Sequence, residues 1–102
     1  MALDLDRIDE VIHGRMRLGI MVYLADAEVA DFTELKTVLE ATQGNLSVHI
    51  KKLEEAGYVA VSKAAVGGRQ RTWLSLTGPG RKAFAGHVAE LTRLAGTVAA
   101  SI

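Results

Sequence analysis

The side chains best suited to binding chemistry lie between residues 42 and 71, and most of them are amides, hydroxyls and cations. Amides can bond base edges in the major groove of DNA, and cations can bond its phosphates. The candidates on the first segment are Thr42, Gln43, Asn45, Ser47, Val48, Lys51 and Lys52, where Val48 would touch a thymine methyl group. Those on the second segment are Lys63, Arg69, Gln70 and Arg71. These residue types predict a surface that binds double-stranded DNA.

Residues that could support other chemistry are scarce. The sequence has no cysteine, which excludes thiolate metal sites, disulfides and cysteine nucleophiles. No nucleophile lies beside a base, and neither a cofactor motif nor a pair of carboxylates in a glycine-framed cleft is present. His13, His49 and His87 lie far apart along the chain, and no two have the i, i+4 spacing of a helical metal site. We therefore expect neither an enzyme nor a bound metal or other cofactor.

The first group of candidates lies on a helix predicted to run from Thr42 or Gln43 to Ala56. Leu46, Ile50 and Leu53 follow one another at i, i+4 and i+7 and form its buried face. A step of about 100° per residue then points a second set of side chains outward. The outward set is Gly44, Ser47, Val48, Lys51 and Glu55, with Asn45 and Lys52 at its flanks. The alternative is that this is an ordinary solvated helix face.

The second group lies on a predicted β-hairpin. Gly57 ends the preceding helix in the left-handed conformation, and two strands, over residues 58–64 and 72–76, flank the Gly67-Gly68 turn. Arg69 and Arg71 would then lie at a mobile tip, and arginine enters narrow minor grooves favourably. The alternative is a basic hairpin whose charges protect an exposed sheet edge.

The remaining helices surround these two segments. They are predicted over residues 6–25, 33–39 and 78–99. Asp4 or Asp6 would cap the first helix and Thr77 the last, while Gly14 marks a potential break. A few residues around Phe32 could add a short third strand. The predicted fold class is mainly α with a small β-hairpin wing (α+β), a winged helix-turn-helix in the order α-α-α-β-β-α.

The last predicted helix carries a narrow apolar seam. Its members recur at steps of four and three residues, which is the spacing of a coiled coil, and one further leucine widens it. The seam consists of Phe84, Val88, Leu91, Leu94, Ala95 and Val98. With Ile8 and Ile12 of the first helix, it is predicted to form the interface of a homodimer. The alternative is that the seam packs only within one subunit.

Bulk properties are those of one soluble domain spanning residues 1–102, because 49% of the residues are hydrophobic and 24% are charged. No apolar run approaches the roughly 20 residues of a membrane span, and the acidic start does not resemble a signal peptide. We therefore expect a cytoplasmic protein without membrane contact. The net charge is zero, but residues 1–41 carry four bases against nine acids, and residues 42–82 carry seven bases against two acids. The net charge of residues 42–82, +5, favours phosphate binding.

Several motifs together resemble the short, single-domain winged-helix transcription regulators of bacteria and archaea, related to the MarR and ArsR families. They are the residues 32–35 (FTEL), 45–50 (NLSVHI), 53–59 (LEEAGYV), Leu76-Thr77 and Gly80-Arg81. The resemblance implies a homodimeric regulator that binds a specific DNA sequence, with the third helix in the major groove and the wing at the minor groove. The chain departs from ArsR metal sensors by lacking cysteine, and from longer MarR proteins by leaving little room for a ligand-binding arm.

Two points stay open from the sequence. A winged helix can also serve as a protein–protein interaction module without DNA binding, and the acidic first third of the chain is compatible with that use. The sequence identifies no small-molecule effector, no operator and no direction of regulation.

Overall fold

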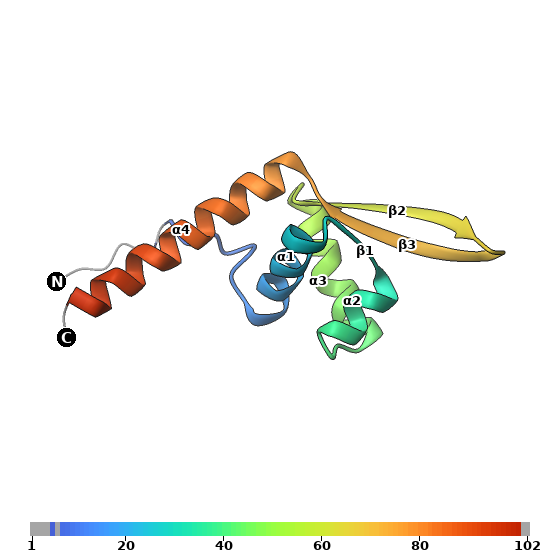
Figure 1. Cartoon of the computed structure of the whole chain (residues 1–102), viewed down its shortest axis with the longest axis horizontal. Coiled ribbons are helices and arrows are strands. Elements are labelled where there is room, and N and C mark those ends of the chain that lie inside the picture. The colour runs from blue at the N-terminus through green and yellow to red at the C-terminus, as the bar shows by residue number, and fades with distance from the viewer. Residues whose placement is uncertain (1–4, 6, 101–102) are drawn as a thin grey trace.

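The computed structural model describes residue 5 and residues 7–100. Its elements are α1 (Arg15–Ala27), β1 (Val29–Asp31), α2 (Phe32–Val38), α3 (Gln43–Glu55), β2 (Val59–Val66), β3 (Arg69–Leu76) and α4 (Gly78–Ala100). Three short helices form a compact body, a long hairpin projects from one side of it, and α4 extends to the other side (Figure 1). The predicted fold class is confirmed, and β1 is the additional short strand.

The predicted start of the first helix is wrong. Gly14 has φ 137° and ψ 140°, a conformation in which L side chains are rare, so α1 begins only at Arg15. The preceding residues form turns instead, in which the Asp9 carboxylate accepts the N–H groups of Val11 (2.9 Å) and Ile12 (3.3 Å). The expected caps at positions 4 and 6 lie outside the described residues.

Side-chain caps fix the starts of the two helices that carry the helix-turn-helix. Asp31 Oδ1 accepts the Glu34 N–H at 2.7 Å and starts α2. Thr42 Oγ1 accepts the Asn45 N–H at 3.1 Å and starts α3 at the predicted residue. The chain leaves α3 through Gly57, whose φ of 82° confirms the predicted left-handed stop.

The sheet is antiparallel with strand order β1-β3-β2. Gly67 and Gly68 form a two-residue turn with φ of 60° and 78°, and Val66 pairs with Arg69 across it. Both strands of the hairpin therefore reach the turn, further than predicted, and we call the outer part of this hairpin, residues 62–71, the wing. Its residues are all exposed, so no alternation of apolar residues marked these strand ends in the sequence.

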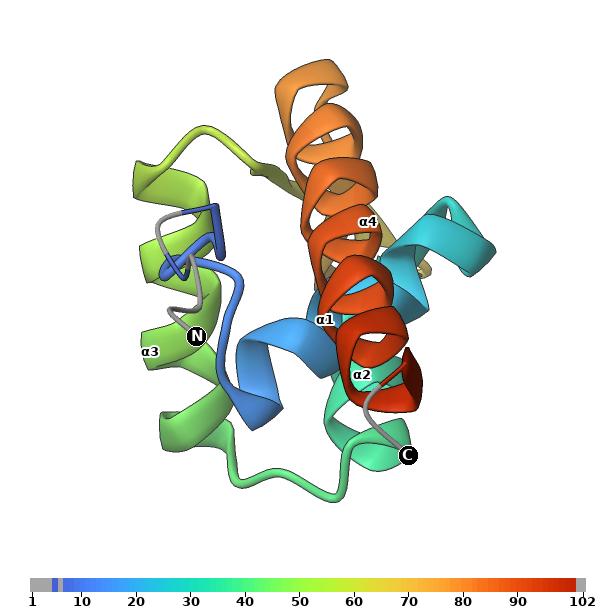
Figure 2. The same cartoon turned by 90° about the vertical axis from the view of Figure 1, so that its left-hand side faces the viewer.

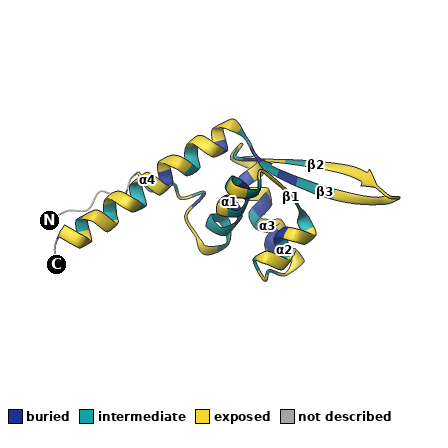
Figure 3. Cartoon of the chain, in the orientation of Figure 1, coloured by how far each residue is buried: buried dark blue, intermediate teal, exposed yellow. Residues whose placement is uncertain are grey.

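One apolar core joins the body. It combines α1, the inner face of α3 and the inner parts of the sheet, through Ile20, Met21, Leu24, Leu46, Ile50, Leu53, Val59, Leu74 and Leu76. Figure 3 shows the buried residues concentrated in this body, whereas the wing and the far end of α4 are exposed or half-buried. The wing is therefore held by the pairing of β2 with β3, and most of α4 is held by a few anchoring contacts, rather than by the core.

The start of α4 is one of these anchors. The Thr77 hydroxyl donates to the Gly57 carbonyl at 2.5 Å and accepts the Gly80 N–H at 2.9 Å, so Thr77 caps the helix as predicted. Gly80 is buried against the connection between α3 and β2, and a Cβ there would lie 2.1 Å from the carbonyl oxygen of Tyr58. A glycine is required at this position because the backbones of α4 and Tyr58 approach so closely.

Candidate nucleic-acid interface

Helix α3 divides the predicted DNA contacts between two flanks. Gln43, Ser47 and Lys51 succeed one another at intervals of four residues and line a groove shared with the wing. Asn45 and His49 lie on the opposite flank and line a second cavity. Val48, which is 53% exposed, lies between the two flanks. The predicted outward face is therefore open to solvent, and its polar residues meet two different surroundings.

The first of these surroundings, which we call the wing groove, encloses about 1140 Å³ between α2, α3 and the wing. All four wing candidates, Lys63, Arg69, Gln70 and Arg71, line it together with Gln43, Ser47 and Lys51. These seven residues come from segments up to 28 positions apart in sequence, and the sheet register places them around one concave surface. Three of the predicted helix contacts and all four predicted hairpin contacts thus meet on one side of the molecule.

The charge of the wing groove is positive on balance. Its lining contains five cations, Lys36, Lys51, Lys63, Arg69 and Arg71, and three acids, Asp31, Glu34 and Glu54. Two of these acids are occupied, because Asp31 Oδ2 accepts Arg71 Nη1 at 3.0 Å and a Glu34 carboxylate oxygen accepts the hydroxyl of Tyr23. The interaction with Glu34 also raises the pKa of Tyr23, so this phenol stays protonated as a donor. Phosphate would meet a net excess of cations here.

The tip of the wing differs from the prediction in one respect. Arg69 follows the glycine turn directly and is exposed, as expected. Arg71 lies further back, and its ion pair with Asp31 ties the wing to the residue that caps α2. Arg71 is therefore an anchor of the wing's base rather than a second arginine at a mobile tip. This pairing spans 40 residues, which is why local patterns in the sequence did not reveal it.

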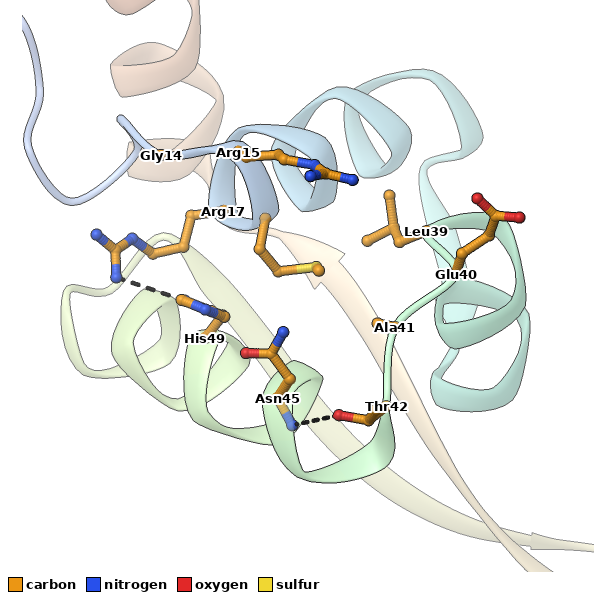
Figure 4. A pocket seen from close by; sticks show the side chains of 10 residues that line it. Gly14, Arg15, Arg17, Leu39, Glu40, Ala41, Thr42, Asn45 and His49 are labelled. Carbon is orange, nitrogen blue, oxygen red and sulfur yellow. Dashed lines mark hydrogen bonds between the residues drawn. The ribbon is translucent and has the colours of Figure 1, made fainter.

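The second surrounding is a cavity of about 450 Å³ between the start of α1, the α2–α3 turn and α3 (Figure 4). Arg15, Arg17, Thr42, Asn45 and His49 belong to its lining. Arg17 makes two long contacts, from Nη1 to His49 Nδ1 at 3.5 Å and from Nη2 to the carbonyl oxygen of Glu10 at 3.4 Å. We call it the arginine cavity. Sequence reasoning missed Arg15 and Arg17. A helix that begins after the potential break at Gly14 would have placed both in its first turn.

His49 is neutral near pH 7 in these surroundings. Partial burial lowers the pKa of its imidazole, and the positive charges of Arg17 and Lys52 lower it further. Because arginine can only donate, the contact with Arg17 assigns Nδ1 as acceptor and leaves the ring proton on Nε2. His49 is thus partly buried on the flank of α3.

The other two histidines meet, which their separation in sequence did not suggest. The rings of His13 and His87 lie 5.7 Å apart between centroids, and His87 is 1% exposed. Neither ring nitrogen of His87 has a hydrogen-bond partner within the described part of the chain. Burial lowers the pKa of His87, His13 lowers it further, and Asp9 opposes both effects. Among the described residues, no group of three potential ligands is arranged to hold a metal ion.

The predicted dimer residues divide between the core and the surface. Ile12 is fully buried within the subunit, so its expected role at an interface is wrong: the turn at Asp9 directs it into the core. Ile8, Phe84, Leu91 and Leu94 are half-buried, and Val88, Ala95 and Val98 are exposed. The seam of α4 is therefore only partly covered by its own subunit, and the far half of α4 extends beyond the body (Figure 1). The view from that end shows α4 in front of the body (Figure 2).

A capped helix with an open face beside a basic wing defines the winged helix-turn-helix class. Residues 16–95 match the family described as winged helix DNA-binding domain, and the chain belongs to this family. The match covers all elements from α1 to most of α4. The protein is accordingly a DNA-binding regulator rather than an enzyme.

Relatives support the same assignment. An uncharacterized protein of Methanocaldococcus jannaschii is 36% identical over 85 residues, which are 83% of this chain and 92% of the relative. The structure of a transcriptional regulator homologue from Pyrococcus horikoshii OT3 is 30% identical, with a TM-score of 0.83 over 88% of this chain and 89% of that one. A zinc-responsive MarR family member, ZitR of Lactococcus lactis, is 25% identical with a TM-score of 0.59, over 83% of this chain and 57% of that one. The chain is thus a winged-helix regulator related to the MarR family.

Across residues 5 and 7–100, none of the helices combines the length and the apolar character needed to cross a membrane.

Proposed function

We propose that the protein regulates transcription as a homodimer that binds a specific sequence of double-stranded DNA, with α3 in the major groove and the wing at the minor groove. The observation that carries the proposal is the wing groove, where the polar stripe of α3 and the basic wing line one open surface. A helix in the major groove needs this arrangement, because base edges and the neighbouring phosphates must be reached together.

The residues of the wing groove have different roles in this complex. Gln43 and Ser47 lie in the first turns of α3 and bond base edges, where a glutamine amide can pair bidentately with adenine. Lys51 and Lys63 bond phosphates, and Arg69 at the glycine turn enters the minor groove. Changing a base-contacting residue therefore alters sequence preference, whereas changing a cation weakens binding to all sequences.

The proposed dimer interface lies on the partly covered seam of α4. Val88 is 42% exposed and Val98 is 63% exposed, and these exposed valines continue the line of the half-buried Phe84, Leu91 and Leu94. An apolar stripe on a helix that leaves the body is stabilised when a second copy covers it. Two subunits would then present two α3 helices to half-sites about 34 Å apart, or a multiple of that spacing.

Selection of bound sequences from a random DNA pool tests the proposal. We expect enrichment of a motif, and gel shifts with that motif should weaken steeply as salt rises. Gln43→Ala should change the enriched motif, whereas Lys63→Ala with Arg69→Ala should lower affinity without changing it. Absence of binding at low salt would reject DNA recognition by this surface.

Sedimentation of the free protein tests the dimer. Val98→Glu places a carboxylate on the exposed seam and should shift the protein toward the monomer, and Thr92→Glu, which is exposed on the same helix outside the seam, serves as the control. A monomer at all concentrations in the unmodified protein would reject the proposed interface.

A further inference from the structure

The arginine cavity, defined above by Arg15, Arg17, Asn45 and His49, lies on the flank of α3 that faces away from the wing groove. We infer that it is a second phosphate-binding site, which holds the DNA strand on the other side of the major groove. The inference rests on the proposed function, because it assumes that α3 enters that groove.

The dimensions of helix and groove provide the first step. An α-helix with its side chains is about 10–12 Å in diameter, and the major groove of B-DNA is about 12 Å wide. A helix that enters the groove fills it, so its two flanks each meet one phosphate backbone. Lys51, on the flank that faces the wing groove, meets one of the two strands. The flank with Asn45 and His49 must then meet the opposite strand.

The charge on that flank provides the second step. Arg15 is exposed and makes no hydrogen bond or ion pair within the described part of the chain. Arg17 uses only two long contacts, both at 3.4 Å or more, and a guanidinium offers five N–H donors. Lys52 is exposed on α3, three residues after His49, and its positive charge lowers the pKa of that histidine. This flank thus holds three cations without an ion pair among the described residues.

The acids near the cavity do not neutralise it. Glu40 belongs to its lining, but its carboxylate lies beyond Leu39, on the side away from Arg17 (Figure 4). Glu10 contacts Arg17 through its backbone carbonyl and not through its carboxylate. Arg15 extends toward Leu39 and Glu40, whereas Arg17 lies beside His49 (Figure 4). A phosphate entering beside His49 would therefore meet the Arg17 guanidinium before the Glu40 carboxylate.

The polar residues of the cavity suit the same ligand. Asn45 is exposed, and its side-chain amide is separate from the capping bond, which uses its backbone N–H. His49 is neutral and carries its ring proton on Nε2, so it is a hydrogen-bond donor without adding charge. Asn45 therefore acts on the backbone of the opposite strand in this arrangement, rather than beside Gln43 and Ser47 on the wing side.

The dependence of DNA affinity on salt tests the inference. Each phosphate contact contributes about 0.9 to the slope of log K against log salt. Replacing both Arg15 and Arg17 with glutamine should lower this slope by about 1.8 per half-site, while the motif enriched from a random pool stays the same. Arg81→Gln removes an exposed charge at the start of α4, outside both cavities, and should leave the slope unchanged.

Two further variants keep the test decisive. If the change at Arg17 impairs folding, Arg15→Gln alone still predicts a loss of about 0.9 in slope, because this exposed side chain has no described partner. Arg17→Lys should restore most of the slope that Arg17→Gln removes, since it restores the charge. An unchanged slope in Arg15→Gln and in the double variant, with normal binding by the unmodified protein, would overturn the inference while the proposed function stands.

A free anion could use the same chemistry as a DNA phosphate. Inorganic phosphate without DNA distinguishes the two: millimolar phosphate that raises the melting temperature of the unmodified protein, but not of the double variant, would indicate a small-anion site. That result combined with an unchanged salt slope would also overturn the inference. If the unmodified protein binds no DNA at all, the proposed function itself fails.

Discussion

Gly44→Ala adds one methyl group and should affect the stability of the fold and the affinity for DNA separately. Gly44 lies at the second position of α3, on the outward face, and a Cβ built there meets no atom within 4 Å. Because glycine costs a helix about 1 kcal/mol relative to alanine, Gly44→Ala should raise the free energy of unfolding by about 0.5–1 kcal/mol. The same methyl group would stand between α3 and the base edges.

We expect Gly44→Ala to stabilise the fold and to weaken DNA binding. Forcing a methyl group into a close-packed contact costs about 1–3 kcal/mol, which corresponds to a loss in DNA affinity of about 5- to 150-fold. Gly86→Ala is the matched control, because Gly86 is also an exposed helical glycine without any neighbour within 4 Å of its Cβ position. It should stabilise the fold by a similar amount and leave DNA affinity unchanged.

Urea denaturation and fluorescence anisotropy with a labelled duplex measure the two quantities. If both alanine variants are stabilised and bind DNA as tightly as the unmodified protein, the N-terminal face of α3 does not approach the duplex closely. The assignment of Gln43 and Ser47 to base edges would then be refuted, even if the wing still contacts DNA.

Two further predictions concern the anchors of α4. Gly80→Ala should lower the free energy of unfolding by at least about 1–3 kcal/mol in urea denaturation, because its methyl group would overlap the carbonyl of Tyr58; a change below 0.5 kcal/mol, on the order of an ordinary surface substitution, would contradict the close approach. Stability should also fall with acidification below about pH 6.5, since His87 has a lowered pKa when folded and the unfolded chain binds its proton first. His87→Leu should flatten this dependence between pH 7.5 and 5, whereas His49→Asn, at a second histidine of lowered pKa, should leave the contribution of His87 in place. Equal pH dependence in His87→Leu and the unmodified protein would contradict the burial of this imidazole.

Much of the DNA-binding half of the molecule was predictable, because its signals are local. The Thr42 cap, the apolar spacing on α3 and the stop at Gly57 each act within one or two turns of the chain. The glycine pair at the hairpin acts in the same way. These signals suffice to predict that a helix with an open face is followed directly along the chain by a hairpin wing.

Some errors arose where two local signals competed. The apolar residues Ile8 and Ile12 continue the spacing of α1, and this periodicity favoured a longer helix than Gly14 permits. The turn at Asp9 resolves the competition, because its carboxylate accepts two backbone N–H groups and directs Ile12 into the core. A helix start at Arg15 then follows from backbone conformation rather than from hydrophobic pattern.

By itself, the sequence determined the order of the main elements, the net positive charge of residues 42–82, and the winged-helix class. Only the tertiary structure decided that Arg71 is tied to Asp31, that Arg15 and Arg17 line a cavity with His49, and that His13 meets His87. The physical reason is the distance along the chain between the residues that interact. Caps, turns and helical periodicity depend on neighbours within a few residues, whereas these contacts join segments separated by 32 to 74 positions, which only the packing of the whole chain brings together.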